Sequence, residues 1–226
     1  MAAYLELGDK RILWKLPENQ ERFYVEELAG VKEKPVYEKV KRTADLVLSL
    51  MALPVLSIPM AGIAVAIVLD TPGNPIYAQK RLGRYEEPFT IYKFRTMQID
   101  AEEDGLCWAS YDDPRVTRVG RVLRKTRMDE LPQLFNIIKG QMSIVGPRPE
   151  RPEFYEVFDT YIDGFRQRML VMPGLTGLAQ VNGGYDLKPE EKIVYDMEYI
   201  RKRSLWLDLS CILKTVRLVF SHDGAR

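Results

Sequence analysis

Residues 46–69 limit the possible folds of this chain more than any other feature, because they form a run of 24 residues without one formally charged side chain. At about 1.5 Å per residue, a helix of that length reaches across a bilayer core of roughly 30 Å. Helices in the cores of soluble proteins rarely stay apolar on every face for so long. The run therefore predicts a membrane segment, and a buried core helix is the less favoured alternative.

Prolines and flanking charges predict how this segment meets the membrane. Pro54 and Pro59 lie in the middle of the run, where each removes a backbone donor and disturbs the preceding turn. Basic residues on both flanks favour placing both ends on the cytoplasmic face. They are Lys39, Lys41 and Arg42 on one side and Lys80, Arg81 and Arg84 on the other. We expect a re-entrant helix–break–helix hairpin with Ser57 and Pro59 at the break, and a pairing of Asp45 with Lys41 one helical turn earlier.

Composition narrows the classes of function. Lys and Arg total 33 against 32 for Asp and Glu, so no basic excess indicates a nucleic-acid binder. Cys107 and Cys211 lie far apart and form no metal-spaced motif, which argues against a zinc site or a disulfide framework. His222 is the only histidine, which nearly excludes histidine-based triads and multi-histidine metal sites.

The remaining pattern divides the chain into three parts. Residues 1–36 are expected to form a polar, partly helical cytoplasmic extension, residues 37–220 one catalytic domain, and residues 221–226 a tail. After the apolar run, residues 76–79 and 89–94 predict two short strands joined by a polar connection.

The end of the domain predicts an amphipathic helix over residues 190–220. Trp206 and Leu207 follow a short basic stretch, which suits a helix lying at the lipid interface. An ordinary amphipathic core helix explains the pattern equally well. Both interpretations stay open at this point.

Residues 126–140 contain the pair of carboxylates best suited to chemistry. Apolar residues recur there at helical spacing, and Gly140 is a natural C-terminal stop. Pro132 is acceptable only in a first turn, so the predicted helix begins near Asp129 and places Asp129 and Glu130 at its N-terminus. Free N–H groups and the positive end of the helix dipole favour phosphate there. Taken alone, helix capping by Asp129 would explain the pattern more simply.

Two segments rich in glycine and proline add candidate ligand contacts. Residues 145–149 form a rigid turn that presents Arg148, and arginine binds phosphate through two N–H groups. Glycines within residues 173–183 let the backbone approach a ligand closely. The chain contains neither GxxxxGK[ST] nor GxGxxG, so neither a P-loop nor a Rossmann phosphate cradle is predicted.

Together these segments resemble the bacterial sugar transferase family, the monotopic phosphoglycosyl transferases, from about residue 37 to residue 220. The matching motifs are Lys41-Arg42 with Asp45, residues 91–97, Leu123-Arg124, and residues 129–133, 140–149, 173–177 and 179–183. The chain departs from the family pattern at three positions. Ile58 stands where the family has the serine of a Ser-Pro pair, Met172 stands at an often basic position, and Gly184 stands where many relatives carry arginine.

The resemblance implies a mainly α fold with a small β element (α+β), held in the membrane by a re-entrant hairpin and interfacial amphipathic helices. It implies transfer of a phosphosugar from a nucleotide sugar, expected to be a UDP-sugar, to undecaprenyl phosphate or another polyprenol phosphate. This is the first membrane step in assembly of a polysaccharide or glycoconjugate, such as an exopolysaccharide, lipopolysaccharide or capsule. The expected location is the bacterial inner membrane, with the catalytic part on the cytoplasmic face and a homodimer as an open option.

The resemblance also assigns roles to residues. Asp129 is expected to be the nucleophile, which forms a covalent aspartyl-phosphosugar intermediate, and the protein contact of Mg²⁺. Glu130 is expected to act as a base for the acceptor phosphate or to help position the metal. The residues expected to bind the substrates are Lys93, Arg95, Arg124, Pro147, Arg148, Gln180 and Asn182.

Two other classes fit part of the pattern. A membrane-tethered, non-catalytic module that binds phospholipids or nucleotides explains the arginines and the apolar run, but not the Asp129–Glu130 pair. Metal-dependent release of nucleoside monophosphate distinguishes the two. A soluble metal-dependent hydrolase with an unusually apolar core helix is the other class, and extraction without detergent would favour it.

Overall fold

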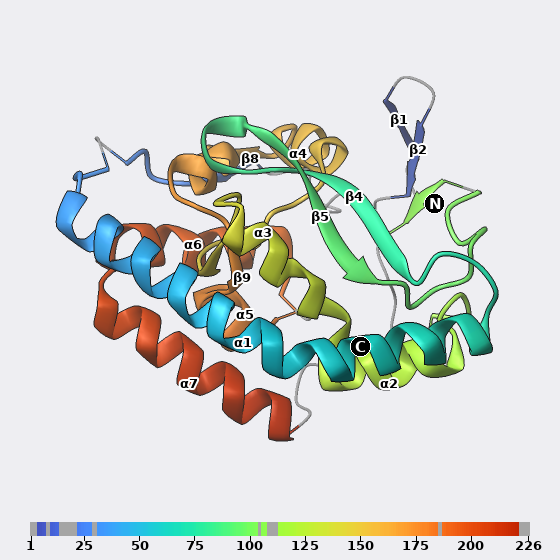
Figure 1. Ribbon diagram of the computed structural model, residues 1–226. Helices are drawn as coiled ribbons and strands as arrows, with labels where there is room; N and C mark the ends of the chain where they lie inside the picture. The colour runs from blue at the N-terminus through green and yellow to red at the C-terminus, as the bar shows by residue number, and fades with distance from the viewer. Residues whose placement is uncertain are drawn as a thin grey trace.

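The computed structural model describes residues 4–7, 10–13, 22–28, 31–103, 105–107, 113–184 and 187–221. Helices dominate the fold (Figure 1). The α-helices are α1 (Pro35–Asp70), α2 (Arg118–Thr126), α3 (Leu134–Ile138), α4 (Pro152–Asp159), α5 (Leu178–Val181), α6 (Pro189–Lys202) and α7 (Leu205–Ser221). The 3₁₀ segments are η1 (Arg84–Glu86), η2 (Met128–Gln133) and η3 (Phe165–Leu170). The predicted α+β fold is confirmed, whereas residues 222–226 of the predicted tail lie outside the described residues.

Short strands pair in several small sheets. They are β1 (Tyr4–Leu7), β2 (Lys10–Leu13), β3 (Phe23–Tyr24), β4 (Ile76–Leu82), β5 (Pro88–Phe94), β6 (Leu106–Cys107), β7 (Ser143–Val145), β8 (Ile162–Asp163) and β9 (Gly174–Thr176). The antiparallel hairpin β4–β5, in which Ile76 lies opposite Phe94, contains both predicted strands. β7 and β9 pair in parallel and join the two segments rich in glycine and proline.

The segment before α1 differs from its prediction. Among the residues described there, none is helical, so the expected partly helical character is wrong for this part of the chain. β1 pairs with β2, β2 also pairs with β6, and β3 pairs with β8. The partners of β2 in β6 and of β3 in β8 are distant in sequence, so tertiary context favours extended structure there.

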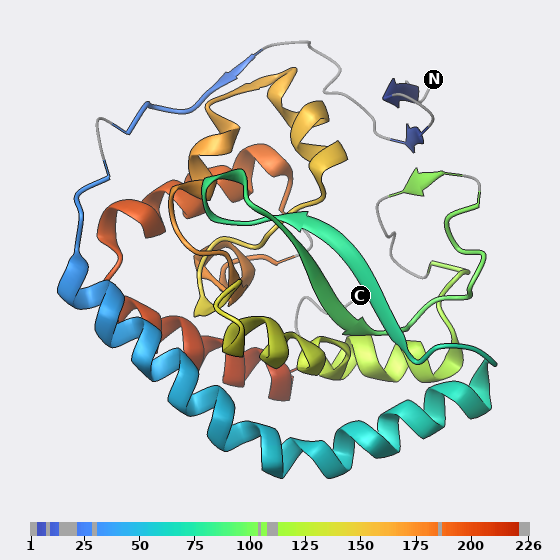
Figure 2. The same ribbon diagram turned by 45° about the horizontal axis from the view of Figure 1, so that its top comes forward.

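The apolar run forms the greater part of α1. Pro35 occupies the first turn, where its missing N–H would be unpaired anyway, and the helix ends at Asp70 ahead of a Pro-Gly turn. The predicted helix–break–helix takes the form of one continuous helix that bends near its middle (Figure 2). Pro54 and Pro59 lie inside it, and the Ser57 hydroxyl donates to the Pro54 carbonyl at 2.7 Å. Prolines are a common cause of helix kinks, so these residues produce a bend and leave the helix unbroken.

Polar contacts fasten the first turns of α1 to the rest of the domain. Lys41 pairs with Asp208 of α7 at 3.0 Å, and Asp45 accepts a hydrogen bond from the Ile144 backbone N–H at 3.2 Å. The predicted pairing of Asp45 with Lys41 is therefore wrong, because both side chains have partners distant in sequence. The Arg42 guanidinium donates to the last carbonyls of α3, at 2.6 Å to Ile137 and 2.9 Å to Ile138.

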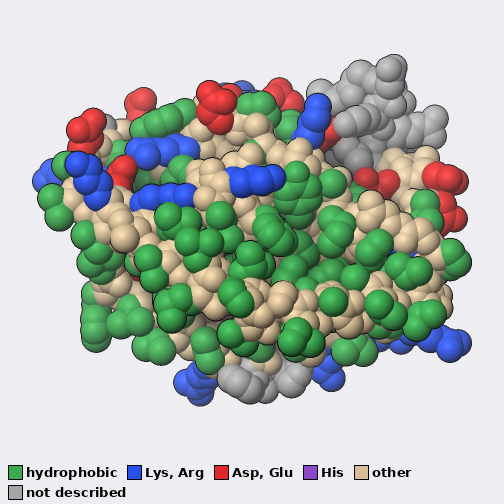
Figure 3. Space-filling model, in the orientation of Figure 1, with side chains coloured by type: hydrophobic (Ala, Val, Ile, Leu, Met, Phe, Trp, Pro, Cys, Tyr) green, Lys and Arg blue, Asp and Glu red, His purple; other side chains and the backbone are tan. Residues whose placement is uncertain are grey.

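A wide apolar surface covers α1 and α7, here called the apolar face. Its exposed side chains are Val47, Leu48, Leu50, Met51, Val55, Ile58, Val65, Val68 and Leu69 of α1, and Leu205, Trp206, Leu209, Leu213 and Val216 of α7. Figure 3 shows hydrophobic side chains spread over this side of the molecule, with basic side chains toward its margins. α1 is long and apolar enough to cross a membrane, and little of its most apolar stretch is buried in the protein. The alternative of a buried core helix is therefore wrong for α1.

The main hydrophobic core lies away from the apolar face, around α4, α6 and η3. The rings of Phe158 and Phe165 are 5.1 Å apart at its centre. Smaller clusters join β5 to α3 and to α1 through Phe89, Ile91 and Phe94. The hairpin β4–β5 is thus held between α1, α3 and the turn at residues 146–151, where it forms one wall of a cavity.

Candidate active site

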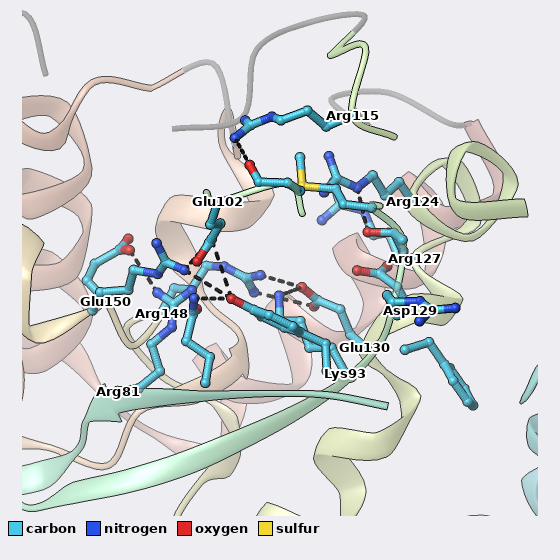
Figure 4. Close-up of a pocket in the computed structure, with 18 of the residues that line it drawn as sticks. Arg81, Lys93, Glu102, Arg115, Arg124, Arg127, Asp129, Glu130, Arg148 and Glu150 are labelled. Atoms are coloured by element: carbon cyan, nitrogen blue, oxygen red, sulfur yellow. Dashed lines mark hydrogen bonds and ion pairs between the residues drawn. The ribbon is translucent and has the colours of Figure 1, made fainter. Parts of the chain in front are cut away.

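A cavity of about 470 Å³ lies between the β4–β5 hairpin, the end of α2, η2 and the turn that carries Arg148 (Figure 4). Among the described residues, ten basic side chains line it: Arg81, Lys93, Arg95, Arg115, Arg124, Arg127, Arg148, Arg151, Arg168 and Lys192. The four carboxylates that line it are Glu102, Asp129, Glu130 and Glu150. Cations outnumber anions by six, so the cavity suits a ligand that carries several negative charges.

A sharp reversal of the chain brings Asp129 into this cavity. Arg127 ends α2 in the left-handed region, with φ 57°, and η2 begins at the next residue. The predicted single helix from Asp129 to Ile138 is wrong, because the segment consists of η2 followed by the short α3. Pro132 has no N–H for an α-helical bond, which is consistent with the tighter 3₁₀ turn. Gly140, with φ 81°, follows α3 as the predicted stop.

Asp129 has a partly buried carboxylate that makes no hydrogen bond or ion pair with any described residue. Burial and the neighbouring charge of Glu130 raise its pKa to about 6, although Lys93, Arg148 and Arg124 act in the opposite direction. The group is therefore mainly ionised at neutral pH and more basic than an ordinary aspartate. A free, ionised carboxylate of this kind can act as a nucleophile or a metal ligand.

Glu130 is held in the opposite way. Its carboxylate accepts a hydrogen bond from the Lys93 ammonium at 3.0 Å and is gripped by both terminal nitrogens of Arg148. Burial works to raise the pKa of Glu130, but Arg148 and Lys93 outweigh it and hold the pKa below its usual range. A carboxylate with a lowered pKa is a poor proton acceptor, so this geometry fits the positioning of two cations better than general-base catalysis.

Most residues predicted to bind the substrates line the cavity, namely Lys93, Arg95, Arg124, Arg148 and Gln180. Arg95 donates to Thr71 at the end of α1, and its side chain is buried. Arg124 donates to the Thr96 hydroxyl at 2.9 Å. Arg95 and Arg124 therefore hold the walls of the cavity as well as contributing charge.

Pro147 and Asn182 are not among the residues that line the cavity, so their assignment to substrate binding stays a prediction. The Pro147 carbonyl accepts a hydrogen bond from Gly174 at 2.9 Å, so it fixes the turn beside Arg148. The Asn182 amide donates to the Leu178 carbonyl at 2.8 Å and caps the short helix α5. Both residues therefore stabilise the backbone conformation of their own loops.

Several lining residues were not predicted as substrate contacts, namely Tyr77, Arg81, Glu102, Arg127, Glu150, Arg151, Arg168 and Lys192. Glu150 and Arg151 directly follow the Gly-Pro-Arg-Pro turn, so their position in the sequence could have indicated them. Lys192 and Arg168 come from α6 and η3, where the sequence carries no local sign of a site.

Comparison with known proteins decides the family. The sequence model of the bacterial sugar transferase family matches residues 36–222, which contain all of α1 except Pro35 and every residue that lines the cavity. The chain belongs to the bacterial sugar transferase family. The resemblance noted from the motifs is therefore confirmed.

Other bacterial sugar transferases match most of this chain. A UDP-N-acetylgalactosamine-undecaprenyl-phosphate N-acetylgalactosaminephosphotransferase of Aeromonas hydrophila is 42% identical over 203 residues, which is 88% of this chain and 48% of the relative. A UDP-glucose:undecaprenyl-phosphate glucose-1-phosphate transferase of Escherichia coli (strain K12) is 38% identical, over 89% of this chain and 46% of the relative. An undecaprenyl-phosphate galactose phosphotransferase of Salmonella typhimurium is 38% identical, over 82% and 41%. The chain thus spans less than half the length of each of these relatives.

Proposed function

We propose that this bacterial sugar transferase transfers a sugar 1-phosphate from a UDP-sugar to undecaprenyl phosphate, the first membrane step in assembly of a bacterial glycan. The observation that carries the proposal is the free carboxylate of Asp129 beside a cation-held Glu130 in a strongly basic cavity. The names of the three relatives share undecaprenyl phosphate as acceptor and differ in the sugar. Two phosphoryl substrates fit the charge of the cavity.

The first step is a displacement at the β-phosphorus of the UDP-sugar. A carboxylate oxygen of Asp129 forms a bond to that phosphorus, and the bond from phosphorus to the oxygen bridging the α-phosphate breaks. The bridging oxygen keeps the electron pair and leaves as part of UMP. The product on the protein is an acyl phosphate that carries the sugar.

The second step repeats the displacement with the acceptor. An oxygen of undecaprenyl phosphate attacks the same phosphorus, and the bond to the Asp129 oxygen breaks. The carboxylate is regenerated and an undecaprenyl diphosphate sugar is formed. Since a phosphate monoester is already largely ionised at neutral pH, this step needs no strong base, in keeping with the weak basicity of Glu130.

Lys93, Arg148 and Arg124 supply the positive charge around the transferred phosphoryl group. Their charges all act on Asp129, so each reaches the position where the phosphate meets the nucleophile. Glu130 fixes Lys93 and Arg148 through hydrogen bonds and so keeps two cations aimed at one place. Preorganised charge of this kind is the main source of catalysis in phosphoryl transfer.

Mg²⁺ fits this site as a metal shared with the substrate. The described residues contain no group of three His, Cys, Asp or Glu side chains that could hold a metal by themselves. Magnesium is commonly bound by one or two carboxylates together with substrate phosphates and water. Asp129 would hold it on the protein side, and the ion would neutralise charge on the diphosphate.

We propose that α1 enters and leaves one leaflet and that the apolar face rests in the bilayer. Arg42 near the start of α1 contacts α3, and Asp70 at its end accepts a hydrogen bond from the Val119 backbone of α2 at 3.1 Å. Because α2 and α3 belong to one domain, both ends of α1 stay on its side of the membrane. The basic flanks support a cytoplasmic location, and the exposed Trp206 supports α7 as an interfacial helix.

The proposal is tested with the purified protein in nanodiscs, a panel of UDP-sugars and undecaprenyl phosphate. We expect one donor to yield UMP and an undecaprenyl diphosphate sugar in equal amounts. Binding of UDP-sugars with no UMP release from any of them would instead support a non-catalytic binding module. Release of UMP that does not depend on a lipid acceptor, with free sugar phosphate as product, would support a hydrolase.

A further inference from the structure

Two groups of charged side chains in the cavity are connected electrostatically by one residue. The near cluster consists of Lys93, Asp129, Glu130 and Arg148, and the far cluster consists of Arg81, Glu150, Arg168 and Lys192. Among the charges that act on Asp129 are those of Lys93, Arg148 and Arg124, whereas Lys192, Arg81, Arg168 and Arg148 act on Glu150. The charge of Arg148, a member of the near cluster, thus acts on a carboxylate in each cluster. In Figure 4, Glu150 and Arg81 lie across the cavity from Asp129, with Glu130 and Arg148 between them.

The far cluster is built rigidly and carries excess positive charge. Arg81 donates to Glu150 at 3.2 Å and to the Pro149 carbonyl at 2.9 Å. Arg168 is only 2% exposed and pairs with Asp196 at 2.7 Å, which places its Nη2 2.9 Å from the Arg148 carbonyl.

Two hydrogen-bond donors in the far cluster have no acceptor among the described residues. The Nε and Nη1 atoms of Arg168 are buried and have no hydrogen-bond partner among the described residues, and Nη1 lies 3.9 Å from Glu150. Burial, with the charges of Arg168 and Arg148, lowers the pKa of Lys192, although the carboxylates of Glu150 and Asp196 act in the opposite direction. An anion bound here would reduce the electrostatic repulsion among Lys192, Arg168 and Arg148.

A rim of mixed chemistry covers the far cluster. The Tyr77 hydroxyl lies 3.0 Å from the Arg151 guanidinium, which also pairs with Glu102 at 2.5 Å. All three side chains line the cavity, as do Phe154 and Gln180. Aromatic rings, carboxylates and amides together offer stacking for a base and hydrogen-bond acceptors for ribose hydroxyls.

The chemistry of the displacement determines which half of the donor reaches this end. In phosphoryl transfer the attacking and leaving oxygens lie roughly in line through phosphorus. A donor whose β-phosphorus faces Asp129 therefore directs its leaving nucleoside monophosphate away from Asp129, past Arg148 and toward Glu150. The sugar, which is not displaced, takes a lateral direction.

We propose that the far cluster and the rim of Tyr77, Glu102 and Arg151 bind the nucleoside monophosphate half of the donor. This assignment rests on the proposed transferase function. Arg81, Arg151 and Lys192 contact the α-phosphate, and Tyr77 and Glu102 contact the nucleoside. Arg168 is a positioning residue, because its guanidinium donates a hydrogen bond to the Arg148 carbonyl.

The test is the affinity of this chain for UMP, measured by calorimetry in nanodiscs. Lys192→Met keeps the length of the side chain and removes its charge, and Lys202→Met at the exposed end of α6 is the matched control. We expect Lys192→Met to weaken UMP binding about tenfold or more, and to raise the donor KM while leaving the acceptor KM unchanged. Lys202→Met should match the parent in both measurements.

A second variant guards against misfolding of Lys192→Met. Tyr77→Ala changes a side chain that is 36% exposed, so it should fold and still weaken UMP binding. UMP affinity within twofold of the parent for either folded variant overturns the proposal. So does a loss of affinity for glucose 1-phosphate with UMP binding unchanged, which would assign the far cluster to the sugar. If the parent binds UMP as expected but no UDP-sugar is turned over, the transferase proposal fails and the nucleotide site stands.

Discussion

Asp129 and Glu130 are adjacent in the chain, but their surroundings move their pKa values in opposite directions. Glu130 receives three hydrogen bonds from Lys93 and Arg148 and keeps its charge, whereas Asp129 has no such partner and is more basic than usual. The same two cations thus fix one carboxylate and leave the other available for attack. At the scale of single residues, this difference supports the proposed positioning role of Glu130 and the proposed nucleophilic role of Asp129.

The raised pKa of Asp129 predicts a pH dependence for the first displacement. Only the anion attacks, so the rate of UMP release should fall by about tenfold per pH unit below a midpoint near 6. The pKa of Glu130 is lowered, so Glu130 stays ionised near pH 6 and adds no second transition to the pH–rate profile there. The measurement is a single-turnover rate against pH, with recovery at neutral pH as the control. A rate that stays constant down to about pH 5 would contradict the assignment.

Arg148 links the two carboxylate clusters, and its loss should affect both substrate binding and turnover. Arg148→Ala removes a two-pronged, charge-assisted contact worth about 1.5–3 kcal/mol, so kcat/KM for the donor should fall roughly ten- to a hundredfold. Arg201→Ala, at an exposed arginine outside the cavity, is the matched control. Kinetic constants equal to those of the parent would reduce the turn to a structural role.

Among the elements, α1 both presents an apolar surface and packs against the rest of the domain, and its sequence predicts only the first of these. Its length and apolar surface follow from the uncharged run, and its start and end follow from Pro35 and the Pro-Gly turn. The contacts of Lys41, Arg42 and Asp45 with α7, α3 and β7 depend on tertiary packing, so the local charge spacing predicted the wrong pair. These contacts connect the long apolar helix directly to the domain that holds the basic cavity.

The same contrast holds for the site. The sequence indicated Asp129, Glu130, Lys93 and Arg148 mainly through motifs that resemble those of the family, because the local pattern around Asp129 alone is also explained by helix capping. It did not indicate η2, since a local pattern cannot show whether Pro132 starts an α-helix or tightens a 3₁₀ turn. Lys192 and Arg168 were missed because only the fold brings α6 and η3 to the cavity.

The re-entrant arrangement of α1 predicts that both of its flanks are cytoplasmic. Lys39→Cys and Lys80→Cys change exposed residues before and after the apolar run, and each is made in a background without Cys107 and Cys211. An impermeant thiol reagent added to intact cells should label neither position, and both should react in opened cells. Labelling of the first position alone in intact cells would show a helix that spans the membrane.

At the scale of the whole molecule, the apolar face and the basic cavity suit the two proposed substrates, which differ in solubility. In the proposed reaction, the polyprenyl tail of the acceptor would remain in lipid beside α1 and α7, while the soluble nucleotide sugar would enter the cavity from water. The cavity is bounded by α2, the β4–β5 hairpin and η2, all of which pack directly or through neighbours on α1. In this arrangement one compact domain could bind a lipid-borne acceptor and a water-soluble donor at the same site.

Metal removal tests whether UMP release requires Mg²⁺ in the cavity. If Asp129 and the donor diphosphate share Mg²⁺, chelation with EDTA should abolish UMP release, and excess Mg²⁺ should restore it. UMP binding in the absence of donor should be less sensitive, because the far cluster consists of protein cations. An undiminished rate of UMP release in EDTA would remove magnesium from the account.

The central claim is that Asp129 carries the sugar phosphate between donor and acceptor. The most direct measurement uses the purified protein with a UDP-sugar labelled in the sugar, without acceptor, and follows both UMP release and label bound to the chain. We predict up to one equivalent of each, discharge of the label when undecaprenyl phosphate is added, and neither signal from Asp129→Asn in a correctly folded state. Turnover that requires both substrates together and never labels the protein, or labelling of Asp129→Asn, would contradict the account.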